Sequence, residues 1–492
     1  MIFAMTNAVQ DRIKRDSRGG SPRSSSILTR GEAKEEAFSL LLQQSETLSD
    51  SPVHRYEDWI ETEDGLRQPF YTIRPTSSES LSFPELDLFF VHIRKEEGRN
   101  FLYFAHKPTS LTIAFQLGSH KLNDGRNSLL EIFYAGMRRL GYSADALLAY
   151  FTHSPLSAFT TSGDASSRSW MNSILREYYY QTPPEPVGKR LLERSNFLYN
   201  EKRTIFFRDK ICWSRTPVEL FNETFFQITG FKAIRSIPGL CIQVRLLDPA
   251  RAVQAECGVF DKKDTKFTKE RLPWRRFKIP RIASFKELSE VMMACFGLLN
   301  YHWTKYVIRP AASSLANELM ILESQDIEQS IEMEKLIRKD QAEELMPTFF
   351  DQDKTGISLL WERRDMQQYW QYDFGDNFWF EIESLEEDEM DYYAVEYLDG
   401  GGDAPPTDVG GYSGFADFQE ALKNPADDEN AFYIRWAVEV VYWHPYDEGV
   451  IQRYLDQVNP LYWDSSYSFS SWAASRDTDK ILGALNVPPG NN

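Results

Sequence analysis

The chain has 492 residues, with 73 acidic and 55 basic side chains, so its formal net charge is −18. Its 33 Phe, 24 Tyr and 12 Trp can bury a large core, which excludes a wholly disordered protein. The acidic excess argues against a general nucleic-acid-binding protein, because phosphate affinity comes mainly from Lys and Arg. Its four scattered Cys form no Cys-x-x-Cys pair, which argues against a structural zinc site and is typical of a reduced, intracellular protein.

The N-terminal residues differ from a secretory signal, because Asp11, Arg12 and Lys14 directly follow a short apolar start. The longest apolar run, 291–299, is far shorter than the roughly 20 residues that cross a bilayer. We therefore expect a cytoplasmic protein without a membrane partner. Residues 1–50 are predicted to be a tail that is disordered over 1–30, followed by a short helix.

Residues 83–230 are predicted to form a first packed domain, in which strands precede helices. The predicted strands cover 86–93, 100–105 and 110–116, and the predicted helices cover 128–140, 145–151 and 169–180. A hairpin is expected over 197–213, with its turn at 200–202. With the Ser- and Arg-containing segment 162–172, this part faintly resembles a small bacterial domain of unknown function, a resemblance that implies no activity.

The second predicted domain opens with two strands, a helix and a third strand. The strands are expected at 240–247, 274–279 and 301–308, and the helix follows the capping box of Ser284 and Glu287 and ends near Gly297. Residues 315–346 predict one long acidic helical stretch, and 414–422 and 448–458 predict two further helices. The fold class is therefore α+β, with two packed domains and a mixed or antiparallel sheet in the second.

The charge is distributed unevenly along the chain. Residues 1–200 are nearly neutral, residues 201–281 carry a net charge of +9, and residues 318–492 carry −27. This asymmetry indicates segments with different functions.

Several short motifs of the second domain occur in a fixed order. They are Pro273-Trp274-Arg275-Arg276, then His302, then Tyr372-Asp373-Phe374-Gly375-Asp376, and then Pro405-Pro406 with Asp408 and Gly410-Gly411. In this order they resemble the plasmid pRiA4b ORF-3-like family, some of whose members are called passenger, TnpR-like proteins of insertion elements. The resemblance covers residues 238–460 and implies one domain there, followed by a C-terminal tail over 461–492.

The chain departs from the family pattern at five positions. Phe378, Phe380, Thr304, Ala404 and Thr407 stand where the family has Trp, His, His, Cys and Glu. If the family uses those polar groups for chemistry, this chain has lost several of them. The departures favour a protein without catalytic residues, cofactor or bound metal.

The acidic motif residues allow two interpretations. Asp373 and Asp376, together with Asp408, fit a site for a cation or basic group, whereas Asp residues beside Gly375 are also typical of turns, which we favour. The resemblance also suggests that Asp373 pairs with Arg275 or Arg276.

His302 is predicted to be a hydrogen-bonded core residue, because Thr304 removes the obvious second metal ligand. The glycines at 400–402 and 410–411 match no phosphate-binding motif and are interpreted as turn residues.

A basic segment precedes the second strand of this domain. It offers phosphate contacts with Trp274 as a stacking platform, and the competing interpretation is a solvated loop neutralised by the acidic part of the chain. Its residues are Lys262, Lys263, Lys266, Lys269 and Arg271.

The sequence leaves three hypotheses of function. The leading one is a non-catalytic interaction or accessory protein, linked to mobile elements, that presents an aromatic and acidic surface to a protein partner. The second is a nucleic-acid-associated factor that uses the basic 201–281 segment. The third is a metal-dependent enzyme around Asp373, Asp376 and Asp408.

Overall fold

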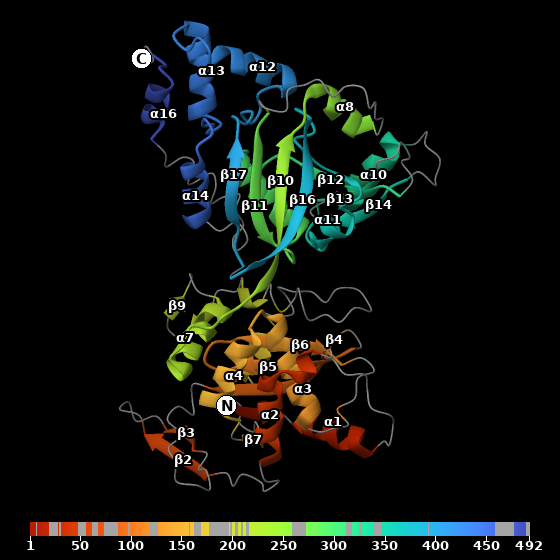
Figure 1. Ribbon diagram of the computed structural model, residues 1–492, viewed down its shortest axis with the longest axis vertical. Helices are drawn as coiled ribbons and strands as arrows, with labels where there is room; N and C mark the ends of the chain where they lie inside the picture. Colours follow the sequence, from red (N-terminus) through yellow and green to blue (C-terminus); the bar gives the residue numbers. More distant parts are fainter. Residues whose placement is uncertain are drawn as a thin grey trace. The chain divides into compact units, whose positions relative to one another are not determined.

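The computed structural model divides the chain into two compact units, Met1–Ser236 and Ile237–Asn492. Figure 1 shows the first unit in red to yellow-green and the second in green to blue. The structure describes residues 1–5, 7–18, 28, 31–47, 56–61, 67–72, 87–96, 99–117, 122, 126–156, 158–161, 169–176, 196, 199–201, 205–207, 210–212, 216–257, 272–310, 317–323, 327–338, 346–391, 393–457 and 477–488.

The first unit is built on a five-stranded sheet with the order β6-β5-β4-β1-β7. Its strands are β1 (Ile2–Met5), β4 (Leu88–Glu96), β5 (Arg99–His106), β6 (Thr112–Gln116) and β7 (Ala158–Thr161). The short strand β1 pairs in parallel with both β4 and β7. The predicted disordered tail is therefore wrong for residues 2–5, because Phe3 is fully buried against the rings of Phe89 and Phe133.

Five of the described helices pack into one core cluster with this sheet. They are α1 (Asn7–Arg18), α2 (Glu36–Thr47), α3 (Arg126–Arg139), α4 (Ala144–His153) and α7 (Pro217–Thr229). Each of them contributes buried apolar side chains to one cluster with the sheet. Helix α1 corrects the tail prediction further, because it occupies residues that were expected to be disordered, whereas α2 confirms the short helix expected after them.

Two short hairpins also belong to this unit. They are β2 (Tyr56–Glu61) with β3 (Arg67–Thr72), and β8 (Ile205–Phe207) with β9 (Lys210–Cys212). The predicted turn at 200–202 is wrong, because residues 199–201 are helical and the hairpin lies after them. The side chain of Asn200 instead exchanges hydrogen bonds with the backbone of Thr112, at the outer edge of β6.

The second unit contains an eight-stranded sheet with the order β14-β13-β12-β15-β16-β10-β11-β17. Its strands are β10 (Ile237–Leu246), β11 (Trp274–Pro280), β12 (Thr304–Arg309), β13 (Leu319–Leu322), β14 (Thr348–Asp351), β15 (Gln367–Tyr372), β16 (Phe378–Met390) and β17 (Glu396–Gly401). Only β13 and β14 pair in parallel. The α+β class and the mixed sheet are thus confirmed.

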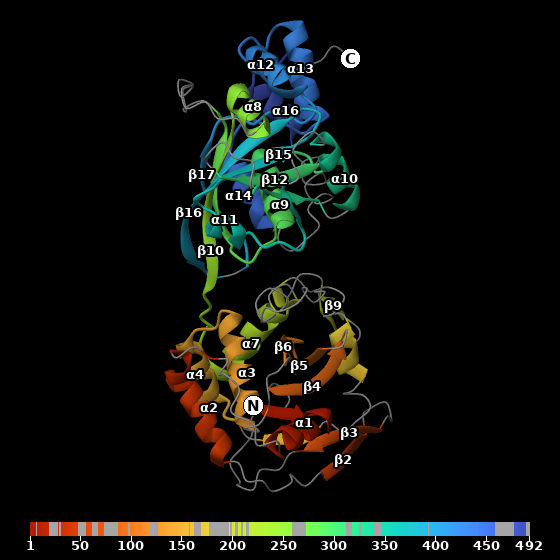
Figure 2. The same cartoon turned by 90° about the vertical axis from the view of Figure 1, so that its right-hand side faces the viewer.

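The helices of the second unit are α8 (Pro249–Cys257), α9 (Phe285–Phe296), α10 (Ile327–Ile337), α11 (Ser358–Glu362), α12 (Gly411–Ala421), α13 (Asp428–Glu439), α14 (Glu448–Gln457) and α16 (Thr478–Ala484). Helix α9 begins at the predicted capping box and ends at Gly297, whose φ is 70°. Figure 2 shows α9 and α14 on one side of the strands β10, β16 and β17.

Two predictions for this unit need correction. The stretch 315–346 is not one helix, because the apolar residues of β13 pair with β12 before α10 begins. The predicted C-terminal tail contains α16, and Arg435 of α13 donates a hydrogen bond to the carbonyl of Pro488 just beyond it.

In the described ranges, no helix is long and apolar enough to cross a membrane.

Candidate functional site

Three loops meet at one end of the eight-stranded sheet. The first enters β12, the second joins β15 to β16, and the third precedes α12. Thr304 pairs with Tyr372, and Tyr372 pairs with Phe378, so the first two loops lie side by side. The third loop is attached by Thr407, whose hydroxyl accepts a hydrogen bond of 3.1 Å from the amide of Leu299.

One titratable residue from each loop forms what we call the His302 cluster: His302, Asp373 and Asp408. Nδ1 of His302 lies 3.4 Å from Oδ2 of Asp373, and Nε2 lies 2.9 Å from Oδ1 of Asp408. The side chains of His302, Asp373 and Asp408 are 19%, 9% and 45% exposed. The cluster is therefore reachable from solvent on the Asp408 side and covered on the Asp373 side.

Asp373 begins the turn between β15 and β16. Its Oδ1 accepts a hydrogen bond of 2.8 Å from the amide of Gly375, and its φ is 56°. The carbonyl of Asp373 also accepts the amide of Asn377 at 2.6 Å. The predicted turn role is thus present, and it leaves the second carboxylate oxygen to face His302.

Asp376 connects the second loop to the start of α12. Its Oδ2 accepts a hydrogen bond of 3.1 Å from the amide of Gly410. Gly410 is the N-cap residue of α12 and has no side chain that could accept a hydrogen bond, so the carboxylate of Asp376 takes this place at the start of the helix. A Cβ on Gly411 would lie only 2.9 Å from the carbonyl oxygen of Asp376, and the φ of Gly411 is 71°. Partial burial raises the pKa of Asp376, and hydrogen bonds from the amides of Gly411 and Gly410 oppose the rise.

The predicted pairing of Asp373 with an arginine of β11 is wrong. Arg275 is buried and donates to the carbonyls of Cys295 and Gly401, at 2.8 and 3.0 Å. Its guanidinium stacks on the rings of Phe296 and Tyr446. Burial lowers the pKa of Arg275. These contacts form a structural link between β11 and β17.

Arg276 likewise lies away from the cluster. It points to the other side of β11, where it donates to Gln243 at 2.8 Å and its guanidinium lies 5.5 Å from the ring centre of Trp274.

The structure places His302, which is predicted to be a hydrogen-bonded core residue, between two carboxylates with 19% of its side chain exposed. Thr304 does remove one partner, but Asp373 and Asp408 supply two others from distant parts of the chain. The sequence did give one indication of this site, because each motif places a polar residue at the end of a strand or the start of a helix. To infer from this that the residues meet, one must know the strand order, which the sequence does not contain.

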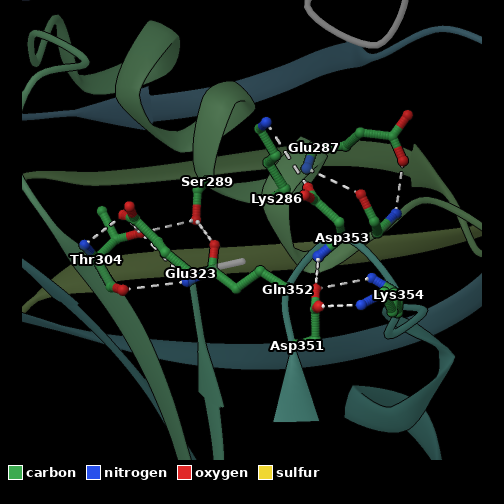
Figure 3. Close-up of polar contacts among 10 residues, drawn as sticks. Lys286, Glu287, Ser289, Thr304, Glu323, Asp351, Gln352, Asp353 and Lys354 are labelled. Atoms are coloured by element: carbon green, nitrogen blue, oxygen red, sulfur yellow. Dashed lines mark hydrogen bonds and ion pairs between the residues drawn. The ribbon is translucent and has the colours of Figure 1, made fainter. Parts of the chain in front are cut away.

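Thr304 itself belongs to a second polar cluster, inside the unit (Figure 3). Its amide and hydroxyl both donate to Glu323, at 2.7 and 2.8 Å, and the Nε2 of Gln352 donates to its carbonyl at 3.1 Å. Burial raises the pKa of Glu323, and the hydrogen bonds from Thr304 oppose the rise. These contacts join β12 to the segments that follow β13 and β14, so we interpret this cluster as structural.

The remaining predicted residues lie apart from the cluster or support its loops. Pro273, Pro405 and Pro406 are buried packing residues. The hydroxyl of Tyr372 donates to the carbonyl of Leu299 at 2.7 Å and stiffens the first loop. The proposed phosphate-binding residues Lys262, Lys263, Lys266, Lys269 and Arg271 lie outside the described residues.

Comparison with known proteins identifies the region that holds these motifs. Residues 268–452 match the family described as plasmid pRiA4b ORF-3-like protein, which confirms the predicted resemblance. A crystal structure of a protein of unknown function from Methanosarcina mazei Go1 is similar, at 17% identity and a TM-score of 0.28. The match covers 41% of this chain and 88% of that one. No curated protein matches the chain.

Proposed function

We propose, from the premise that residues 268–452 form a pRiA4b ORF-3-like domain, that this protein is a non-catalytic accessory protein whose second unit binds a cationic protein segment. The binding face is the acidic–aromatic surface, which we define as Tyr301, Trp303, Phe374, Asp376 and Asp408. Lysine or arginine side chains of the partner would contact its rings and carboxylates.

Three large aromatic side chains of this surface are unusually exposed. Tyr301, Trp303 and Phe374 are 57%, 42% and 47% exposed. They lie on adjoining chain segments, because the carbonyl of Trp303 accepts a hydrogen bond of 3.1 Å from the amide of Asp373. Exposed rings grouped in this way are typical of interaction sites.

One contact within the chain carries the proposal. The ammonium group of Lys305 lies 5.2 Å from the centre of the Phe374 ring, which is cation–π geometry. The ring face of this surface therefore already holds a lysine from the chain itself. A partner lysine or arginine would use the same interaction on the neighbouring rings.

The charge of the surface favours the same kind of partner. Within the described part of the chain, no lysine or arginine forms an ion pair with Asp373, Asp376 or Asp408. The surrounding segment 318–492 carries a net charge of −27, which attracts a basic partner over distances of about one Debye length.

The positions at which the chain departs from its family support a non-catalytic role. Phe380, which replaces a family His, is buried and packs against the rings of Phe296 and Trp370 at 4.9 and 5.1 Å. Ala404, which replaces a family Cys, is buried and its carbonyl accepts a hydrogen bond from Trp443. These two positions fill the core instead of offering reactive groups.

A peptide titration tests this proposal directly. Fluorescence anisotropy of a labelled nine-residue peptide of alternating Lys and Ser should show saturable binding to the full chain in chelator-treated buffer, weakened by salt. Trp303→Ala should lower the affinity about two- to fivefold. Lys305→Met should raise it, because the Phe374 ring loses its internal cation and the Glu334 carboxylate loses the ammonium with which it pairs.

A matched control is available on α13. Phe432 is 75% exposed but lies outside the acidic–aromatic surface, so Phe432→Ala should leave the affinity unchanged. Equal binding of a Glu-Ser peptide, or equal losses in Phe432→Ala and Trp303→Ala, would contradict the proposal.

The link to mobile elements is the second part of the proposal. Its support is the plasmid named in the family description. Transposase or plasmid-maintenance genes beside the coding sequence in several genomes would strengthen it, and their consistent absence would count against it.

A further inference from the structure

We infer that His302 and Asp408 bind a divalent first-row transition-metal ion, and that Asp373 orients His302 for this purpose. The inference does not rest on the proposed peptide binding, because it depends on the contacts of His302, although both proposals use Asp408. The ligand atoms of His302, Asp373 and Asp408 lie within 4.8 Å of one another.

The contact between His302 and Asp408 has the wrong direction for a hydrogen bond. Nε2 and Oδ1 are only 2.9 Å apart, yet Nε2 is shielded from solvent and makes no hydrogen bond. The carboxylate oxygen therefore lies well off the axis along which a ring N–H would point. When Nε2 carries its lone pair, two acceptor atoms this close require a cation that both can contact.

The same geometry suits chelation. Imidazole nitrogen and carboxylate oxygen bind such ions at about 2.1 Å. For an ion at that distance from both atoms, which lie 2.9 Å apart, the angle Nε2–ion–Oδ1 is roughly 90°. This is the angle between neighbouring ligands in octahedral and related coordination. The off-axis position of Asp408, which prevents a hydrogen bond, is the position that a shared ion requires.

Asp373 lies on the other side of the imidazole ring. Its Oδ2 faces Nδ1 at 3.4 Å, and its Oδ1 is held by the amide of Gly375. A carboxylate at Nδ1 favours the tautomer with the proton on Nδ1 and the lone pair on Nε2, as in carboxylate–histidine–metal arrangements. Asp373 is therefore a positioning residue.

Asp408 is also held in place by its neighbours. The hydroxyl of Tyr301 donates to its Oδ2, which leaves Oδ1 for the ion. Its φ of 59° sets the direction of the side chain. Because Asp408 is exposed, water or a partner group can fill the remaining coordination positions. An imidazole ligand favours zinc, cobalt or nickel over magnesium, calcium or manganese.

Isothermal titration calorimetry on the metal-stripped full chain tests the inference. Zinc, cobalt and nickel should bind with one ion per chain, and magnesium and calcium should bind at least about tenfold more weakly. Asp408→Asn should abolish this binding, and Asp373→Asn should weaken it about 10- to 100-fold. Glu420→Gln on α12 is the control, because it removes an exposed carboxylate that lies outside the His302 cluster, and it should leave binding nearly unchanged.

His302→Gln provides a second variant in case Asp408→Asn disturbs its loop, and the absorption spectrum of bound cobalt reports nitrogen ligation directly. Binding that persists in both variants, or that falls equally in Glu420→Gln, overturns the inference. The peptide titration runs with chelator present, so its result is independent. Absence of metal binding leaves the peptide proposal standing, and absence of peptide binding leaves the metal inference standing.

Discussion

Both units of this protein place a histidine beside a buried or half-buried aspartate, but in opposite settings. In the first unit, Asp87 and His106 are buried, and the two side chains approach to 3.9 Å. The hydroxyls of Tyr150 and Ser154 both donate to Asp87, and Thr109 shares a hydrogen bond of 2.8 Å with His106. Every group of this cluster has a partner inside the protein.

The His302 cluster of the second unit uses the same residue types differently. One ring nitrogen of His302 makes no hydrogen bond, and Asp408 lies at the surface. The comparison teaches that residue types do not distinguish a structural cluster from a ligand site. The two kinds of cluster differ in whether every polar group has a hydrogen-bond partner inside the protein and in whether solvent can reach the cluster.

The largest effect is expected from the enclosed cluster. Asp87→Ala would leave the buried hydroxyls of Tyr150 and Ser154 without their acceptor, which should destabilise the first unit by about 3–5 kcal/mol. Urea unfolding, with hydrogen exchange of α3 and α4 as the local readout, measures the loss. A change below about 1 kcal/mol would contradict the structural interpretation of this cluster.

A smaller loss is expected where backbone geometry supports the open cluster. Gly411→Ala would force a Cβ against Asp376 at positive φ, which should destabilise the second unit by about 1–3 kcal/mol. Gly483→Ala in α16 is the control, because nothing lies within 4 Å of its added Cβ, and it should be neutral or slightly stabilising. Equal effects of the two substitutions in urea unfolding would show that Gly411 has no special role.

The open cluster itself should contribute little to stability. Asp408→Asn removes an exposed carboxylate beside His302 and should change the free energy of unfolding by less than about 1 kcal/mol. The same urea experiment measures this change beside that of Asp87→Ala. A loss as large as that of Asp87→Ala would remove the contrast between the two clusters.

The smallest effect is a pH dependence at Glu323. Burial raises the pKa of Glu323 above its ordinary value of 4.5, so the folded protein holds this proton to higher pH than the unfolded chain does. The stabilisation from this group is present below about pH 4.5 and is lost as the pH rises through the raised pKa. Glu323→Gln should therefore flatten the fall of unfolding free energy between pH 4.5 and 7, whereas parallel curves would contradict the assignment.

Local patterns predicted much of the second unit correctly. The capping box of Ser284, the glycine end of α9 at Gly297 and the strand that begins at Trp274 all follow from neighbouring residues. The strand β1 was missed because four residues are too few for periodicity, and its strand state depends on pairing with β4 and β7.

The candidate site was only partly predictable. The sequence identified Asp373, Asp376 and Asp408 as one candidate group and His302 as a separate motif residue. The predicted partner of Arg275 was a carboxylate, whereas in the structure its guanidinium contacts backbone carbonyls and aromatic rings. A buried arginine satisfied by backbone groups has no sequence signature, because any residue can supply a carbonyl.

The amino-acid sequence by itself determined the α+β class, the family motifs and their order, and the acidic character of the second half. These properties depend on composition and on residues close together in the chain. Only the tertiary structure decided that His302, Asp373 and Asp408 meet and that Arg275 stays apart from them. Those distances depend on the strand order and on the loop that Thr407 attaches, which bring together residues that are far apart in the sequence.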